Sequence, residues 1–120
     1  LYAIGGRING RHDRSITANE EYDPVANRWT TRSPLPTVRS GIAAAVLDQK
    51  VFVFGGESPR GTHKEVESYD PSGNRWQRWA PMPTARHGLG VALLGRSIYV
   101  IAGGPQPGAT YSSVNEVFTP

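Results

Sequence analysis

The three histidines are the first residues to consider for chemistry, because an imidazole can bind a metal or transfer a proton near neutral pH. They are His12, His63 and His87. No i, i+4 pair or other spacing typical of metal ligands relates them. The chain also has no cysteine, which excludes disulfides and thiolate metal sites. We therefore expect neither a metal site nor a cofactor.

Acid–base catalysis would require carboxylates or histidines that converge on a substrate. The carboxylates that could serve with the histidines are Asp13, Glu57 and Glu65. No spacing of a nucleophile and a base accompanies them. A non-catalytic function is therefore the leading hypothesis.

Arginine dominates the charge of the chain. Eleven of the 13 basic residues are arginine, and the net charge is +3. The planar guanidinium binds carboxylates through two parallel hydrogen bonds, so it suits an acidic partner. The charge is too small to indicate nucleic acid by itself, and no exposed aromatic platform accompanies it. We expect a protein or peptide partner of acidic character, and no nucleic acid.

The elements that must position these side chains follow from a repeat. The segment YDPVANRW at 22–29 returns as YDPSGNRW at 69–76, 47 positions later. A double glycine follows each of three apolar runs, and a shortened third copy ends the chain. The repeat marks are Gly5, Gly6, Tyr22, Trp29, Gly55, Gly56, Tyr69, Trp76, Gly103, Gly104 and Phe118. A fixed period of this size indicates stacked supersecondary units.

Each unit reads as four short strands, and no stretch has the length and 3.6-residue period of a helix. Strand a is expected at 41–47 and 88–94, and strand b at 1–6, 51–56 and 99–104. Strand c is expected at 20–22, 65–69 and 114–118, and strand d at 28–31 and 75–80. The chain thus holds strands b-c-d, then a-b-c-d, then a-b-c.

The repeat marks have local physical reasons. Glycine allows positive φ and close backbone approach where strand b ends. Asp-Pro begins a turn in which the aspartate can cap nearby amides, and asparagine then tolerates a left-handed conformation. The repeated Tyr and Trp residues, including Trp29 and Trp76, are expected to be buried in the packing between units. Trp79 lies outside the repeat and is expected either between units or as an exposed contact.

A four-stranded repeat with Gly-Gly, then Tyr, then Trp seven residues later resembles the kelch repeat of β-propellers. The resemblance covers nearly the whole chain and implies an all-β, kelch-type β-propeller fragment with four-stranded antiparallel blades. Blade 1 is expected at 1–37 and blade 3 at 85–120, both incomplete, with a complete blade 2 at 38–84. All three would belong to one partial kelch domain, with the remaining blades of the parent propeller as partners.

Antiparallel strands place the b–c and d–a loops on one rim. In this sequence these loops hold seven basic residues against three acidic ones, and their lengths vary between copies. Variation of this kind is typical of the binding face of a repeat protein. In kelch propellers that bind peptides, the residues after Gly-Gly and those opening strand a line the mouth of the central channel. That resemblance implies a ligand site of Arg7, Asn9, Arg11, Arg39, Ser40, Glu57, Ser58, Arg86 and His87.

Two of these residues have a second interpretation. Arg39 and Arg86 recur at the repeat period, as do Glu20, Glu67 and Glu116, so an Arg–Glu pair inside each blade competes with ligand contact. Likewise, the arginines at 7, 11 and 14 do not recur, and are either specific contacts or solvated loop residues.

The function predicted is a non-catalytic binding module that recognises a protein segment or anionic ligand through this rim. The alternative is part of a kelch-propeller enzyme acting on a sugar. No apolar run approaches the roughly 20 residues of a membrane helix, and no signal segment is recognisable, so no membrane partner is expected.

Overall fold

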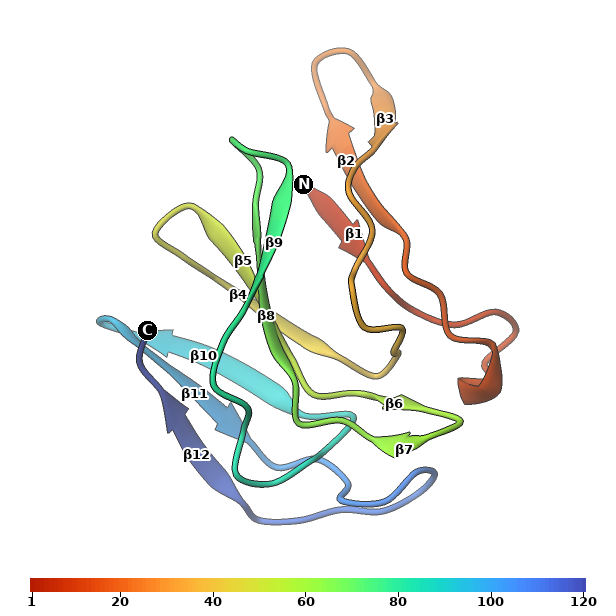
Figure 1. Ribbon diagram of the computed structural model, residues 1–120, viewed down its shortest axis with the longest axis vertical. Coiled ribbons are helices and arrows are strands. Elements are labelled where there is room, and N and C mark those ends of the chain that lie inside the picture. Colours follow the sequence, from red (N-terminus) through yellow and green to blue (C-terminus); the bar gives the residue numbers. More distant parts are fainter.

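The computed structural model describes the backbone of residues 1–120 and every side chain except that of His12. The first sheet contains β1 (Tyr2–Ile4), β2 (Asn19–Asp23) and β3 (Arg28–Thr31). The second has the order β4 (Ala43–Leu47), β5 (Lys50–Phe54), β8 (Val66–Asp70) and β9 (Arg75–Arg78). The third contains β10 (Gly90–Leu94), β11 (Ser97–Ile101) and β12 (Asn115–Phe118). The sheets follow one another in chain order, with the four-stranded sheet in the middle (Figure 1).

All strand pairs within these sheets are antiparallel, and they match the predicted strands a to d. Two differences are local. Strand d of the middle sheet ends at Arg78, and a two-stranded hairpin, β6 (Glu57–Ser58) with β7 (Gly61–Thr62), extends the b–c loop of that sheet. Hydrophobic alternation cannot reveal so short and polar a hairpin.

Helical structure in the described chain is limited to the 3₁₀ turn η1 (His12–Arg14). No helix of the described residues is long and apolar enough to cross a membrane. The fold is therefore all-β, as the sequence predicts.

The repeated turns have the predicted conformation. Asn27 and Asn74 both have positive φ, of 48° and 46°. Each accepts a hydrogen bond from the tyrosine hydroxyl five residues earlier, at 2.8 Å in both copies. The Asp70 carboxylate accepts the amide of Ser72 at 2.9 Å, as Asp23 accepts the amide two residues on. The YDPxxNRW segment thus forms the same internally hydrogen-bonded turn in both copies.

The core lies mainly between the second and third sheets. Phe52 and Phe54 are almost fully buried, and both rings contact the ring of Phe118, with centroids 5.7 and 5.6 Å away. Trp79 packs against Phe52 and Phe118, and its indole N–H donates to the Ser68 hydroxyl at 2.8 Å. Trp79 therefore leaves strand d in order to fill the interface between two sheets, the first of the two alternatives drawn from the sequence.

The prediction for Trp29 is wrong. Its side chain contacts Tyr22 but remains 50% exposed. Its counterpart Trp76 packs on the fully buried Tyr69 and donates to the Ser33 carbonyl at 2.8 Å. Ser33 belongs to the linker that follows the first sheet. A tryptophan at this repeat position is therefore covered by the sheet before its own, and Trp29, which lies in the first sheet, has no such cover.

The glycine marks of the third copy also need a shift of one residue. Gly55 and Gly56 have φ of 60° and 113°, whereas the matching values of 57° and 91° belong to Ala102 and Gly103. Gly104 instead takes the position of Glu57, because each forms the same isolated bridge to the start of strand a. The 47-residue offset of the aromatic marks therefore holds here as well.

The first glycine of the first two pairs has a packing role. A Cβ on Gly55 would collide with the Arg86 carbonyl, and one on Gly5 would lie 3.0 Å from the Arg39 carbonyl. In both cases the carbonyl belongs to the strand-a entry of the following sheet. Glycine is thus required where one sheet passes closely over the next.

Candidate functional site

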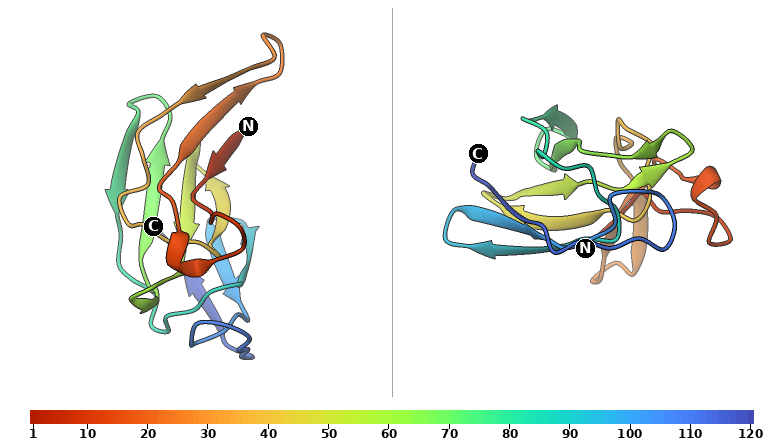
Figure 2. Two further views of the ribbon diagram at one scale, coloured as in Figure 1. Left: turned by 90° about the vertical axis from the view of Figure 1, so that its right-hand side faces the viewer. Right: turned by 90° about the horizontal axis from the view of Figure 1, so that it is seen from below.

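The rim expected to bind a partner is formed by residues 5–18, 32–42, 55–65, 79–89 and 102–114, which we call the b–c/d–a rim. These loops leave the sheets at their common edge, on the lower right in Figure 1. The turns at 24–27, 48–49, 71–74 and 95–96 emerge at the opposite edge. Figure 2 shows the long loops projecting beyond the sheets from two further directions.

Glu57 is the point where the rim loops of all three sheets meet. Its side chain is only 3% exposed, and its Oε1 accepts a hydrogen bond from the Arg7 guanidinium at 2.9 Å. The amide of Gly108 donates to Oε2 at 3.2 Å, and His87 Nδ1 lies 3.6 Å from Oε1. Glu57 therefore joins the sheets, and its carboxylate is not free for a ligand.

Arg39 forms a buried ion pair inside the second sheet. Its side chain is fully buried, and it donates to Glu67 at 2.8 Å and to the Gly55 carbonyl at 2.5 Å. Glu67 is also fully buried, and it accepts the Thr37 hydroxyl at 2.7 Å. Burial lowers the pKa of Arg39, and the ion pair with Glu67 opposes that change.

Arg86 plays the same part in the third sheet. It donates to Glu116 at 2.8 Å and to the Ala102 carbonyl at 2.7 Å. Its side chain has no exposed surface, whereas that of Glu116 is 17% exposed. The geometry of both arginines favours the Arg–Glu pair inside a blade over contact with a ligand.

The nine residues expected in the ligand site divide into two groups. The structure leaves Arg7, Asn9 and Arg11 exposed and His87 partly exposed. It buries the other five, which are Arg39, Ser40, Glu57, Ser58 and Arg86. Burial of two arginines reduces the accessible positive charge of the rim. The exposed basic residues are Arg7, Arg11, Arg14, Arg60 and Lys64, and of these Arg7 pairs with Glu57 and Arg11 with Asp13.

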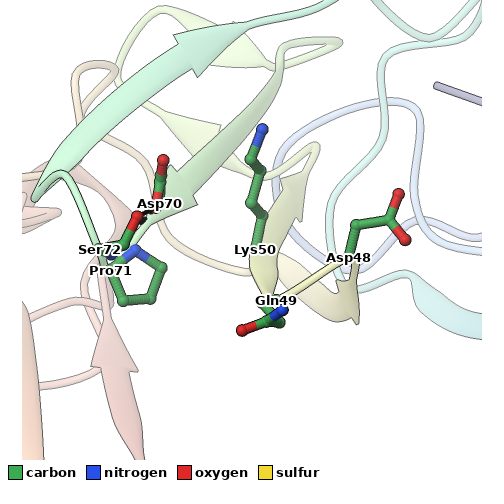
Figure 3. A pocket seen from close by; sticks show the side chains of 6 residues that line it. All are labelled: Asp48, Gln49, Lys50, Asp70, Pro71 and Ser72. Carbon is green, nitrogen blue, oxygen red and sulfur yellow. Dashed lines mark hydrogen bonds between the residues drawn. The ribbon is translucent and has the colours of Figure 1, made fainter.

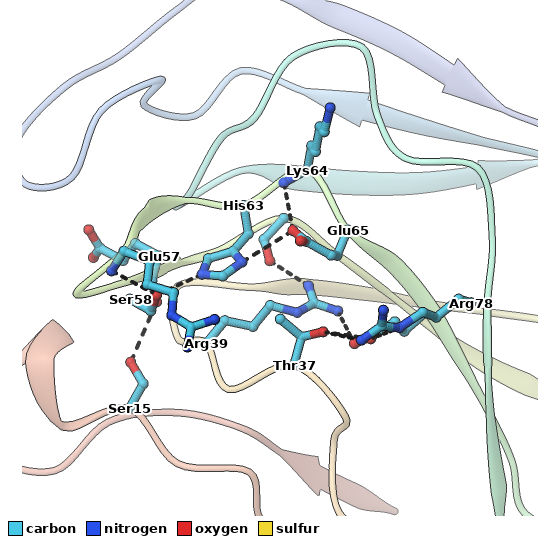
Figure 4. Close-up of polar contacts among 12 residues, drawn as sticks. Ser15, Thr37, Arg39, Glu57, Ser58, His63, Lys64, Glu65 and Arg78 are labelled. Atoms are coloured by element: carbon cyan, nitrogen blue, oxygen red, sulfur yellow. Dashed lines mark hydrogen bonds and ion pairs between the residues drawn. The ribbon is translucent and has the colours of Figure 1, made fainter.

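Ser58, His63 and Glu65 form a hydrogen-bonded chain that the sequence did not predict. His63 Nε2 lies 2.8 Å from Ser58 Oγ, and Nδ1 lies 3.2 Å from the Glu65 carboxylate (Figure 4). Partial burial raises the pKa of Glu65, but a backbone amide and His63 outweigh it and hold the pKa below its ordinary value. An ionised Glu65 favours the proton on Nδ1, which leaves Nε2 to accept the Ser58 hydroxyl.

This order of groups is the one that activates a serine nucleophile. Here, however, the Ser58 residue is only 2% exposed, and its Oγ also accepts the amide of Arg60 at 3.2 Å. Both partners of the hydroxyl lie in or beside the β6–β7 hairpin. The hydrogen bonds among Ser58, His63 and Glu65 therefore stabilise the b–c loop of the second sheet.

A hollow of about 350 Å³ on the opposite edge contains two carboxylates (Figure 3). Asp48 pairs with Arg96 at 2.6 Å, and this hydrogen bond lowers the pKa of Asp48. Asp70 accepts the Ser72 hydroxyl at 2.6 Å, which lowers its pKa in the same way. Asp70 therefore caps its own turn, whereas Asp48 joins the β4–β5 turn to the β10–β11 turn of the next sheet. Among the described side chains, no three His, Asp or Glu residues gather as a metal site; His12 lies outside those side chains.

The fold and this rim define a class of protein: a repeat of antiparallel sheets, each passing closely over the next, with its variable loops on one edge. The kelch motif matches residues 39–83. The chain is 38% identical over 58 residues to Kelch-like protein 26 of Danio rerio, and that match covers 47% of this chain and 9% of the relative.

Two further relatives agree. Kelch-like protein 15 of Homo sapiens is 32% identical over 66 residues, which is 55% of this chain and 10% of the relative. Kelch-like ECH-associated protein 1A of Danio rerio is 39% identical over 64 residues, which is 52% of this chain and 10% of the relative. The matched segment is thus about a tenth of the length of each relative. The middle sheet therefore contains a kelch motif, the chain is similar to kelch-like proteins over about half of its length, and the fold agrees with a fragment of a kelch-type propeller.

Proposed function

We propose that this chain is part of a non-catalytic protein-interaction module that recognises an acidic protein segment through the b–c/d–a rim. The kelch motif and the kelch-like relatives support a role in protein interaction. The observation that carries the finer proposal is the setting of Arg7. Glu57 anchors its guanidinium at the junction of three sheets, while 31% of the side chain stays exposed beside Asn9 and Arg11.

An anchored arginine is well suited to recognition. The ion pair with the buried Glu57 holds the guanidinium in place, so less side-chain entropy is lost when a ligand binds. Arg11 is exposed as well, with its guanidinium paired to Asp13 at 2.6 Å, and charges at such a rim mainly accelerate encounter with an oppositely charged partner. The proposed contacts are Arg7, Asn9, Arg11 and His87.

The experiment compares two double charge reversals. Arg11→Glu with Arg14→Glu changes the b–c/d–a rim, and Arg28→Glu with Arg75→Glu makes the same change in charge on the opposite turns. Binding of a fluorescent oligoglutamate peptide is measured by anisotropy at low salt, with oligolysine as the negative probe. We expect the first pair to weaken binding and the second to have little effect.

Arg7 requires a milder substitution. Reversal to glutamate would place a second carboxylate against buried Glu57 and disturb folding, so Arg7→Gln is the suitable variant. Equal oligoglutamate binding by both charge-reversed proteins would refute the rim assignment.

The blade boundaries belong to this proposal as well: blades at 1–37, 38–84 and 85–120, covered by further blades of a parent propeller. Leu93, Leu94 and Val117 of the third sheet are 45%, 70% and 59% exposed, which supports the need for a covering sheet. Proteolysis of a longer chain that includes the neighbouring repeats should leave these residues protected.

A serine-type enzyme, which differs from the sugar-converting alternative drawn from the sequence, would depend on the Ser58–His63–Glu65 chain. If that chain activated the serine, a fluorophosphonate probe would label Ser58. We expect no labelling, because the hydroxyl is buried and engaged within its own loop. A covalent adduct on Ser58 by mass spectrometry would support the enzyme instead.

A further inference from the structure

A cavity of about 460 Å³ opens between the linker that precedes β4 and the β6–β7 hairpin. Thr37 and Arg78 line one side, and Ser58, Arg60 and His63 line the other. Figure 4 shows Thr37 and Arg78 together at one end of this polar region and Ser58 with His63 at the other. The residues that line the cavity include no carboxylate.

The cavity has an excess of positive charge. Beneath it, Glu67 is shared by Arg39 at 2.8 Å and Arg78 at 3.4 Å, so one carboxylate faces two guanidinium groups. Arg78 is held only loosely, since its contact with the Thr37 hydroxyl is 3.5 Å long and 72% of its side chain is exposed. Arg60 adds a further cation from the hairpin. The lining itself carries no negative charge, and the nearest carboxylates are Glu67 beneath it and Glu65 behind His63.

The far wall is more rigid than the two arginines. His63 is 9% exposed and is fixed between Ser58 and Glu65. A ligand would therefore meet a fixed polar wall and two movable guanidinium groups, each able to donate two parallel hydrogen bonds.

We propose that this cavity binds a phosphoryl group presented on a side chain of the protein partner. A phosphoryl group carries a charge of about −1.5 to −2 and three acceptor oxygens, so it can use both Arg60 and Arg78 where a carboxylate has only two oxygens to offer. The cavity volume lies within the usual range for small ligand sites, about 300–1,000 Å³. This inference rests on the proposed role of the b–c/d–a rim in protein binding, and it adds a second contact away from Arg7.

The test uses the intact chain and two probes: inorganic phosphate, and a glycine-rich peptide with one phosphoserine. Both are titrated while backbone amide resonances are followed by NMR. We expect shifts at residues 58–63, and about tenfold weaker binding of the phosphopeptide by Arg60→Ala, as the loss of a charge-assisted hydrogen bond predicts. The matched control is Arg75→Ala, which removes another exposed arginine from the opposite edge and should change nothing.

Each other outcome is decisive. Unchanged affinity in Arg60→Ala, or shifts spread over the whole surface, would overturn the proposal. Binding of inorganic phosphate without preference for the phosphoserine peptide over its serine version would mean an adventitious ion only. Arg78→Gln provides a second variant, with thermal unfolding measured alongside because Arg78 also contacts Glu67.

Oligoglutamate binding is measured on the same variants in order to separate the two proposals. If only the phosphoryl site is wrong, Arg60→Ala leaves the binding of inorganic phosphate and of the phosphoserine peptide unchanged. Arg11→Glu with Arg14→Glu still weakens oligoglutamate binding. If the proposed rim function is wrong, that reversal has no effect.

Discussion

Replacement of Arg39 by alanine should destabilise the chain strongly. The substitution removes the hydrogen bonds from Arg39 to the Glu67 carboxylate and to the Gly55 carbonyl. Both partner side chains in the ion pair are fully buried, so water cannot replace the lost donor. Loss of one member of a buried ion pair costs about 3–5 kcal/mol.

Two features of the site adjust this magnitude. Glu67 keeps the Thr37 hydroxyl and the longer contact with Arg78, which places the expected loss in the lower half of that range. Arg39 Nε is buried without a hydrogen-bond partner, so the intact pair already carries a desolvation cost. We therefore expect a loss of about 3–4 kcal/mol, a large share of the roughly 5–15 kcal/mol typical of a domain.

Urea unfolding monitored by tryptophan fluorescence measures this loss. The matched variant Arg86→Ala should cost less, about 1.5–3 kcal/mol for a charged hydrogen bond, because Glu116 is 17% exposed and can be hydrated. The double variant Arg39→Met with Glu67→Leu should recover part of the stability, since it leaves no unpaired buried charge. A loss below about 1 kcal/mol for Arg39→Ala would refute a structural role for Arg39. Weaker binding of the acidic peptide without destabilisation would instead support Arg39 as a ligand contact.

Four other substitutions test the remaining assignments. Trp76→Ala should cost about 3 kcal/mol and Trp29→Ala about 1 kcal/mol or less, because the first is packed between sheets and the second is half-exposed; equal losses in urea unfolding would contradict this contrast. Ala102→Gly should stabilise the chain by about 1 kcal/mol, because Ala102 has a φ of 57°, and a lower unfolding midpoint would argue against strain there. Glu65 has a folded-state pKa below its ordinary 4.5, so its contribution is present at neutral pH and is lost as the pH falls through the folded-state value. In Glu65→Gln this part of the acid dependence of thermal unfolding should disappear, and an unchanged pH profile would contradict the hydrogen-bonded chain with His63.

The sequence alone determined the features that depend on neighbours along the chain. The strands, the turns with left-handed Asn27 and Asn74, and the capping by Asp70 follow from residue types at fixed spacing, so they could be predicted. The kelch resemblance followed from the same local marks. The regular offset of 47 residues could also have identified Ala102 as the equivalent of Gly55. The glycine pair at 103–104 instead suggested an alignment that is wrong by one residue.

Tertiary structure alone decided which polar residues are buried. Arg39 and Arg7 are both arginines beside strand ends, yet one is enclosed between Glu67 and Gly55 while the other remains partly exposed. The exposure of Trp29 likewise depends on whether a preceding sheet covers it.

The cavity could not be predicted for a similar reason. Its lining comes from three separate segments around Thr37, Arg60 and Arg78, which the sequence pattern had assigned to a linker, a loop and a strand without relating them to one another. Periodicity records what recurs along the chain. The side chains that set burial, charge balance and binding at this rim meet only because the sheets pack side by side, and contacts of that kind leave no regular spacing in the sequence.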